Sequence, residues 1–222
     1  MGKVIQSRSE VVRILDLLGE TYPDASCELT HRTPYQLLAA VMLSAQTTDK
    51  RVNQVTEILF EKYPDAKAMI EVSPEEIGNI IKSIGMYRTK ANNLLKLSRM
   101  LVEQYDGSVP EDQKLLEQLP GIGRKSANVV MAEAFGHQRI AVDTHVFRVA
   151  NRIGLVKEKD VLHTEESLMK VLPEDRWTES HHLLIWHGRR LCKARNPECD
   201  LCPLTDLCVK AGIEKKGNTD GK

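Results

Sequence analysis

The architecture of this 222-residue chain follows from one segment, Leu119-Pro-Gly-Ile-Gly-Arg-Lys-Ser-Ala-Asn-Val-Val130. It links a short helical pattern to a longer one through a tight hairpin that holds two glycines. Glycine adopts backbone conformations that are closed to other residues, and it leaves main-chain N–H groups uncovered. Here those groups lie at the start of the next helix, where the dipole favours an anion such as a phosphate. An ordinary helix–helix connection is the alternative, but Leu-Pro-Gly-x-Gly-Arg-Lys-x-Ala is much more specific than a lone G-x-G.

Outward from the hairpin, the chain reads as helical nearly throughout. Thr33-Pro34 is typical of a helix cap followed by proline, and Ser73-Pro-Glu-Glu76 is typical of a capping box. The best strand candidate, Arg139-Ile-Ala-Val142, is too short to seed a sheet. The sequence therefore predicts an all-α fold. Apolar residues at spacings of three and four predict helices over residues 8–20, 34–45, 48–62, 75–83, 88–104, 113–118, 124–135, 144–153, 164–171 and 178–191.

The bulk composition is that of an ordinary globular protein, with 41% hydrophobic and 28% charged residues. No apolar run approaches the roughly 20 residues that span a bilayer, and the first residues do not resemble a signal peptide. We therefore expect a cytoplasmic protein with no membrane association. Basic and acidic residues balance at 31 each, so positive charge for nucleic acid must be local. Residues 187–195 offer such a patch, although a solvated helix end explains it equally well.

Four of the five cysteines, Cys192, Cys199, Cys202 and Cys208, fall within seventeen positions in the pattern C-x6-C-x2-C-x5-C. In a cytosolic protein, such a cluster indicates metal ligands rather than disulfides. Four thiolates suit either zinc or a [4Fe–4S] cluster. Because zinc sites usually pair two short C-x2–4-C knuckles and only one is present, the spacing favours iron–sulfur and leaves zinc open. The isolated Cys27 is expected to be a buried small hydrophobic residue.

Two residues near the hairpin carry candidate chemistry. Lys125 is in the first turn of a predicted helix, where the dipole disfavours a cation and so favours a neutral, nucleophilic amine. A phosphate contact or a merely solvated lysine is the alternative. Asp143, in Ala-Val-Asp-Thr-His-Val-Phe-Arg148, is either a helix cap or a carboxylate that stabilises positive charge on a sugar, and one residue can do both. His145 is either a surface histidine or a phosphate contact.

Taken together, these motifs resemble the endonuclease III family of helix–hairpin–helix DNA glycosylases. The resemblance rests on the hairpin, on Val-Asp-Thr-His beginning seventeen positions after the lysine, and on the terminal cysteine pattern. Leu43-Ser-Ala-Gln-Thr-Thr-Asp49 is also similar to an early segment of that family, and the likeness covers essentially residues 8–208. It implies two helical domains with DNA bound in a cleft between them. One is a six-helix domain over residues 27–137, the other an iron–sulfur domain formed by residues 1–26 and 138–212, and residues 213–222 are expected to be a flexible tail.

The resemblance also implies how the protein would hold DNA. A damaged, oxidised pyrimidine would be flipped out of the double helix, with Gln46 filling the gap and Met86 wedging near the opposite base. Many family members have leucine where Met86 stands, which bears on opposite-base preference. Without the family pattern, a buried or surface Gln46 and a core Met86 would be the ordinary interpretations. The remaining DNA contacts are expected from Gly121, Gly123, Arg124, His145, Lys193 and Arg195.

The activity implied is that of a bifunctional glycosylase and abasic-site lyase of base excision repair, with a [4Fe–4S] cluster and double-stranded DNA as partner. Lys125 would attack C1′ and form a Schiff base, Asp143 would stabilise the cationic transition state, and β-elimination would break the strand 3′ to the abasic site. One alternative is an adenine-mismatch glycosylase, which lacks this lysine and normally has a further C-terminal domain. Another is a non-catalytic helix–hairpin–helix DNA-binding module. A monomer, associated with the nucleoid through DNA, is expected.

Overall fold

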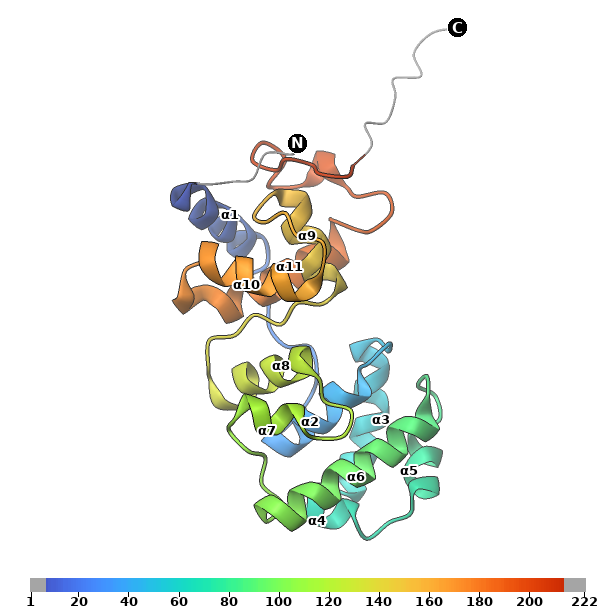
Figure 1. Ribbon diagram of the computed structural model, residues 1–222. Coiled ribbons are helices and arrows are strands. Elements are labelled where there is room, and N and C mark those ends of the chain that lie inside the picture. Colours follow the sequence, from blue (N-terminus) through green and yellow to red (C-terminus); the bar gives the residue numbers. More distant parts are fainter. Residues whose placement is uncertain (1–6, 214–222) are drawn as a thin grey trace, which may run out of the picture. The chain divides into compact units, whose positions relative to one another are not determined.

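A computed structural model describes residues 7–213, and within that range the chain is built of helices with no strand (Figure 1). The all-α prediction is confirmed. Residues 139–142 form an irregular connection. The predicted flexible tail lies outside the described residues, apart from Ile213. The α-helices are α1 (Arg8–Thr21), α2 (Pro34–Leu43), α3 (Asp49–Lys62), α4 (Ala66–Met69), α5 (Pro74–Ile81), α6 (Tyr87–Tyr105), α7 (Gln113–Glu117), α8 (Arg124–Phe135), α9 (Thr144–Ile153), α10 (Val161–Val171) and α11 (Trp177–Arg190), with 3₁₀ turns at Glu174–Arg176 and Cys199–Leu201.

The chain divides into two compact units. Unit 2 spans Cys27–Ala141, and unit 1 combines the residues before it with those from Val142 onward. Unit 2 holds seven helices, α2 to α8, one more than the six predicted. The extra helix, α4, is a single turn whose first amides are capped by Asp65, the Oδ1 of which accepts a bond from Ala68 N at 2.8 Å. Four residues are too few to show a helical period, so the pattern analysis missed it.

Helix α2 forms the centre of unit 2. All of its residues from Tyr35 to Leu43 are buried, and it packs against α3, α6 and α8. A helix that is apolar all round must be covered on every side. The amphipathic helices α5 and α6 pack on each other, and α7 packs on α8 beside the hairpin (green in Figure 1). The hairpin is therefore attached directly to the core helix.

Unit 1 combines α1 with the helices α9 to α11. Helix α1, blue in Figure 1, packs on α11, and α9 packs on both α10 and α11. The core of unit 1 includes Ile14, Leu18, Val149 and Leu184, all fully buried. Gly188 lets α11 approach α9 closely, because an added Cβ would come within 3.0 Å of Val149 Cγ2. Residues 191–213 follow α11 as a loop whose buried anchor is Leu204.

The capping predictions are confirmed in part. Thr33 Oγ1 accepts from Gln36 N at 3.2 Å, and Ser73 Oγ accepts from Glu76 N at 3.2 Å. The reciprocal half of the box is not formed, because the Glu76 carboxylate accepts a hydrogen bond from the Tyr63 hydroxyl instead. Between residues 7 and 213, no helix has the length and hydropathy required to span a membrane.

Candidate functional site

The hairpin between α7 and α8 contains two glycines with different structural roles. Gly121 has φ +82°, and a Cβ there would come within 3.0 Å of Met42 Cγ and 3.3 Å of Asn93 Nδ2. Gly123 has an ordinary φ of −109° and open space around it. It is the N-cap of α8 and provides no side chain to bind the first helical amides. Gly121 is thus needed for the turn, whereas Gly123 keeps the start of the helix open to an incoming group.

The candidate nucleophile Lys125 and its neighbour Arg124 are both exposed in the first turn of α8. A second nucleophilic side chain, the half-buried Cys27, lies within electrostatic reach of Lys125. Burial raises the pKa of the Cys27 thiol to about 11, and the charges of Glu133 and Asp49 add to the effect while Lys125 opposes it. Cys27 therefore stays a protonated thiol at neutral pH and does not compete as a nucleophile.

The two residues expected to enter the DNA, Gln46 and Met86, are exposed and have left-handed backbones, with φ +55° and +54°. The core interpretation of Met86 is wrong, since its exposed fraction is 53%. Helix α2 ends at Leu43, two residues before the predicted end, because the chain turns into the Gln46 loop. Lys90, only 4% exposed, holds that loop: its Nζ donates to Ala45 O at 2.7 Å and to Thr47 Oγ1 at 2.9 Å. Sequence reasoning missed Lys90, which carries no local signal of this role.

In unit 1, Asp143 caps α9 with one of its two carboxylate oxygens. Oδ1 accepts from His145 N and from Val146 N, both at 2.8 Å. Oδ2 takes no part in either capping bond. The cap and the catalytic interpretations of Asp143 are therefore compatible, since one oxygen fixes the side chain and the other can face a substrate.

Arg148, which the sequence analysis did not single out, fastens α9 to the start of the cysteine loop. Its Nη2 donates to Gly188 O at 2.9 Å and to Cys192 O at 3.0 Å. It also lies 3.2 Å from His145 Nδ1. Because an arginine only donates, that imidazole nitrogen is the acceptor, and a neutral His145 carries its proton on Nε2.

The four clustered cysteines line one cavity of unit 1, together with His187, Leu204 and other residues of the loop. None of the four forms a disulfide. Among the described residues, no three histidine, cysteine, aspartate or glutamate side chains are arranged to hold a single metal ion. A zinc ion needs four ligands about 2.3 Å from one point, whereas four thiolates around a cavity suit a larger iron–sulfur cluster. The donor set therefore fits iron–sulfur and disfavours zinc.

Polar groups surround the sulfurs of this cavity. Lys210 N donates to Cys208 Sγ at 3.3 Å, and Arg152 Nη1 lies 3.8 Å from Cys192 Sγ. Burial raises the pKa of the Cys202 and Cys208 thiols. Thiolates are stable in such a place only when metal cations balance them, which couples the cluster to folding.

The two cations of the cysteine loop differ in their surroundings. Lys193 forms an ion pair with Glu198, while Arg195 lies exposed two residues further along. Arg190, from the same basic run, stacks over the Trp186 ring at 3.6 Å and is thus engaged within the protein. The local positive patch is therefore smaller than the sequence suggests, and Arg195 is its most available member.

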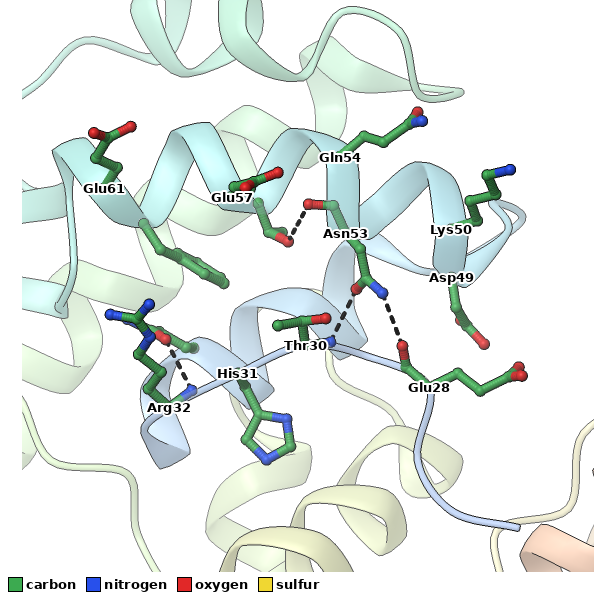
Figure 2. A pocket seen from close by; sticks show the side chains of 13 residues that line it. Glu28, Thr30, His31, Arg32, Asp49, Lys50, Asn53, Gln54, Glu57 and Glu61 are labelled. Atoms are coloured by element: carbon green, nitrogen blue, oxygen red, sulfur yellow. Dashed lines mark hydrogen bonds between the residues drawn. The ribbon is translucent and has the colours of Figure 1, made fainter. Parts of the chain in front are cut away.

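A separate hollow of about 970 Å³ lies in unit 2, beside α3 and the irregular segment before α2 (Figure 2). The side chain of Asn53 on α3 binds the backbone of that segment, donating to Glu28 O at 2.8 Å and accepting from Thr30 N at 2.9 Å. Four carboxylates and two cations line the hollow, a composition that does not favour a phosphate. The DNA-directed residues are outside this lining. Its lining residues are Glu28, Thr30, His31, Arg32, Gln36, Asp49, Lys50, Asn53, Gln54, Thr56, Glu57, Phe60 and Glu61.

An all-helical fold with an uncapped glycine hairpin followed by an exposed lysine, and a four-cysteine loop in the other unit, defines the helix–hairpin–helix class of DNA-repair glycosylases. Residues 39–174 match the model of the HhH-GPD superfamily of base excision DNA repair proteins. Residues 192–208 match the iron–sulfur binding domain of endonuclease III. The chain belongs to the endonuclease III family, and it is a DNA glycosylase and abasic-site lyase with a [4Fe–4S] cluster.

Individual relatives agree with this assignment. Endonuclease III of Bacillus subtilis strain 168 is 51% identical over 205 residues, covering 91% of this chain and 94% of the relative. Endonuclease III of Escherichia coli K12 is 46% identical and covers 91% and 96%. A solved non-covalent endonuclease III–DNA complex superposes with a TM-score of 0.88 at 49% identity, covering 92% of this chain and 96% of that one. DNA binding and base excision repair are thereby shown for the family of this chain.

Proposed function

We propose that this enzyme removes damaged, oxidised pyrimidines from double-stranded DNA and cleaves the strand 3′ to the resulting abasic site. The proposal rests above all on Lys125, an exposed amine in the first turn behind the open hairpin. A solved structure at 49% identity is described as a trapped endonuclease III–DNA covalent intermediate. A covalent mechanism needs a nucleophile, and Lys125 is the candidate next to the hairpin. Borohydride trapping on damaged DNA is the test.

In the proposed mechanism, the Lys125 amine attacks C1′ of the flipped nucleotide and the base departs with its bonding electrons. The Asp143 carboxylate, held through Oδ1 at the head of α9, uses Oδ2 to stabilise positive charge on the sugar. The amine then forms a Schiff base with the opened sugar. Loss of a proton from C2′ expels the 3′ phosphate by β-elimination.

The cluster is proposed to be held by Cys192, Cys199, Cys202 and Cys208, which line one cavity. With all four irons bound by protein thiolates, no coordination position is left for a substrate. The cluster then serves to hold residues 191–213 in shape. It thereby fixes the position of Arg195 for contact with a phosphate.

Phosphate contacts are proposed from the hairpin amides at the start of α8 other than that of Ile122, which donates to Leu119 O at 3.0 Å. Further contacts are proposed from Arg124, from His145 through Nε2, and from the cluster-loop cations. Gly121→Ala and Gly123→Ala separate folding from binding. The first forces a Cβ into φ +82° against Met42 and should lower the free energy of unfolding by about 2 kcal/mol. The second should leave stability within about 0.5 kcal/mol. It should nevertheless weaken DNA binding roughly tenfold, because the Cβ occupies the space a phosphate needs. Unchanged affinity in Gly123→Ala would remove the hairpin from the interface.

Binding should weaken steeply with salt despite the zero net charge, and Arg195 should contribute most among the cluster-loop cations. We expect the Lys193→Ala, Arg195→Ala double variant to flatten the log–log salt slope by up to about 1.8, as two lost phosphate contacts require. Arg195→Ala alone should account for more than half, because Lys193 is paired with Glu198. Lys67→Ala, which breaks the ion pair with Asp106 in unit 2, is the control. An unaltered slope in the double variant would contradict the assignment.

Gln46 is proposed to fill the gap left by the flipped base, and Met86 to contact the opposite base. Both side chains are exposed on left-handed turns, which project them from the surface. Gln46→Ala should slow base excision from duplex DNA about tenfold, since flipping costs a few kcal/mol that an inserted side chain partly offsets. Cleavage at a preformed abasic site should change much less. Gln54→Ala, an exposed glutamine of α3, should affect neither; equal losses on both substrates would indicate a general binding role for Gln46.

The enzyme is proposed to act as a cytoplasmic monomer that associates with the nucleoid through DNA. The adenine-mismatch alternative is disfavoured by Lys125, and the non-catalytic alternative requires neither Lys125 nor Asp143. A borohydride-trapped adduct on oxidised-pyrimidine DNA distinguishes this enzyme from both.

A further inference from the structure

A chain of buried polar groups reaches the cysteine cavity from α1. His187, 1% exposed on α11, places its Nε2 at 3.6 Å from Cys202 Sγ. Its Nδ1 lies 3.1 Å from the hydroxyl of Tyr22, which ends α1 and is 6% exposed. Neither His187 nor Tyr22 has a part in the mechanism above. Two buried polar side chains aligned on one sulfur need a reason to be there.

The direction of the hydrogen bonds in this chain follows from the chemistry of a ligated cysteine. A thiolate that binds iron has no proton to donate, so Cys202 Sγ can only accept. Nε2 of His187 must therefore carry a proton and donate it to the sulfur. With the proton on Nε2, a neutral ring has a lone pair on Nδ1, and the Tyr22 hydroxyl donates to it. Burial raises the pKa of Tyr22 to about 12, which keeps that hydroxyl protonated.

Tyr22 is itself held in place by neighbours from α11. Its ring meets Trp186 edge-on, with centroids 6.4 Å apart, and Arg190 lies 5.7 Å above it. Trp186 Nε1 donates to Ser26 O at 3.3 Å. These contacts hold the Tyr22 side chain in place, and its hydroxyl in turn orients the His187 imidazole.

We propose that His187 is a positioning residue of the iron–sulfur cluster: it donates an N–H···S hydrogen bond to Cys202 and is oriented by Tyr22. This rests on the proposed ligand role of Cys202. Hydrogen bonds to cluster sulfurs stabilise the more reduced, more negative state and so raise the reduction potential. Partners outside the ligand shell also hold the ligands in orientation. The Tyr22–His187 pair therefore raises the potential of the cluster and fixes the Cys202 side chain.

Three substitutions of His187 separate hydrogen bonding from packing. His187→Gln keeps an N–H near the position of Nε2, His187→Asn keeps a polar group only near Nδ1, and His187→Leu keeps neither. Each holoprotein is assayed for iron content, for the potential of its one-electron couple by voltammetry, and for iron–sulfur stretching frequencies by resonance Raman spectroscopy. We expect a more negative potential and shifted frequencies for His187→Leu and His187→Asn, with values near the wild type for His187→Gln.

Tyr22→Phe removes the hydroxyl that binds His187 Nδ1 and leaves the imidazole itself unchanged. It should shift the potential in the same direction by a smaller amount. Tyr35→Phe is the matched control, because it removes another buried tyrosine hydroxyl, bonded to Ser98 at 2.8 Å in unit 2. It should leave the potential and the frequencies unchanged even though it also costs stability.

Each outcome decides the proposal. Loss of iron from His187→Leu and His187→Asn but not from His187→Gln supports it, because holding the cluster then depends on the N–H donor near Cys202. A His187→Leu protein with full iron and the wild-type potential and frequencies overturns it. So does a His187→Gln protein whose iron content, potential and frequencies are changed as much as those of His187→Leu. If Tyr22→Phe behaves as the wild type does, Tyr22 has no part. Borohydride trapping is measured alongside: trapping that persists while the potential is unmoved refutes this inference and leaves the proposed function standing.

Discussion

The Cys199→Ser variant is expected to purify without the brown colour of the wild type and to fall from close to four irons per chain to nearly none. Cys199 begins the 3₁₀ turn Cys199–Leu201 and lines the same cavity as the other three cysteines. Leu204 is the one fully buried apolar side chain of residues 191–213, so apolar packing does not replace the cluster there, although α9 binds the loop through polar contacts such as Arg148 to Cys192 O. Metal binding and folding are coupled in such sites. Thermal unfolding at a lower temperature and protease cleavage within residues 191–213 should accompany the loss of iron.

Cys27→Ser is the matched control for this experiment. Cys27 is the fifth cysteine of the chain and lies in unit 2, packed against its core. It should keep full iron and full colour, with only a modest loss of stability. Full iron in Cys199→Ser would remove that residue from the ligand set. Stoichiometric zinc in wild-type protein prepared without oxygen would contradict the cluster itself.

Helices were predictable from the sequence because the apolar period and the capping residues both act over a few positions. Thr33 and Asp143 cap α2 and α9 through bonds to amides two or three residues ahead. Helix α10 starts three residues earlier than predicted, at Val161, because Asp160 caps it. Its first two residues, Val161 and Leu162, are exposed apolar residues that gave no amphipathic signal.

The supports of the site were less predictable, because they join residues far apart in the chain. Lys90 holds the Gln46 loop across more than forty positions, and Arg148 reaches the carbonyl of Cys192 over a similar separation. His187 and Tyr22 are farther apart still. Hydrogen bonds of this kind leave no period or spacing in the sequence. The motif residues themselves were recognisable because turn geometry and metal ligation demand particular residue types at short range.

The number of cations available to a phosphate could not be predicted from the sequence either. The basic run over residues 187–195, which includes the end of α11, contains four cations, yet Lys193 is paired with Glu198 and Arg190 is stacked on Trp186. Counting charges along the chain therefore overstated the patch. Only the spatial neighbours reveal which cations remain available to a phosphate.

Lys125→Gln is expected to abolish borohydride trapping and to lower strand cleavage by at least about 10³-fold, which corresponds to about 4 kcal/mol of barrier. Glutamine keeps the length of the side chain but has no amine to form a Schiff base. Binding to damaged DNA should be largely retained, because the hairpin amides are untouched. Lys114→Gln, an exposed lysine of α7 in the same unit, removes the same charge and should trap normally. An adduct formed by Lys125→Gln at the wild-type rate would assign the nucleophile to another residue.

Asp143→Asn should slow base excision by about 10²-fold, or about 2.7 kcal/mol of barrier, because a neutral amide cannot balance positive charge on the sugar. Its fold should persist, since the asparagine oxygen can accept the capping bonds now made by Asp143 Oδ1. Asp160→Asn makes the same change at the cap of α10, in the same unit, where Oδ1 accepts from His163 N at 3.0 Å. Asp160→Asn also removes an exposed ion pair with His163, which contributes little to stability. Both variants should therefore stay folded, and they should differ in single-turnover excision. If both excise damaged bases at the wild-type rate, Asp143 is only a cap; if both are equally slow, the loss reflects unit 1 folding. A slow Asp143→Asn beside a normal Asp160→Asn places the missing charge at the reaction, and cleavage of preformed abasic sites then shows whether that charge acts before or after the base leaves.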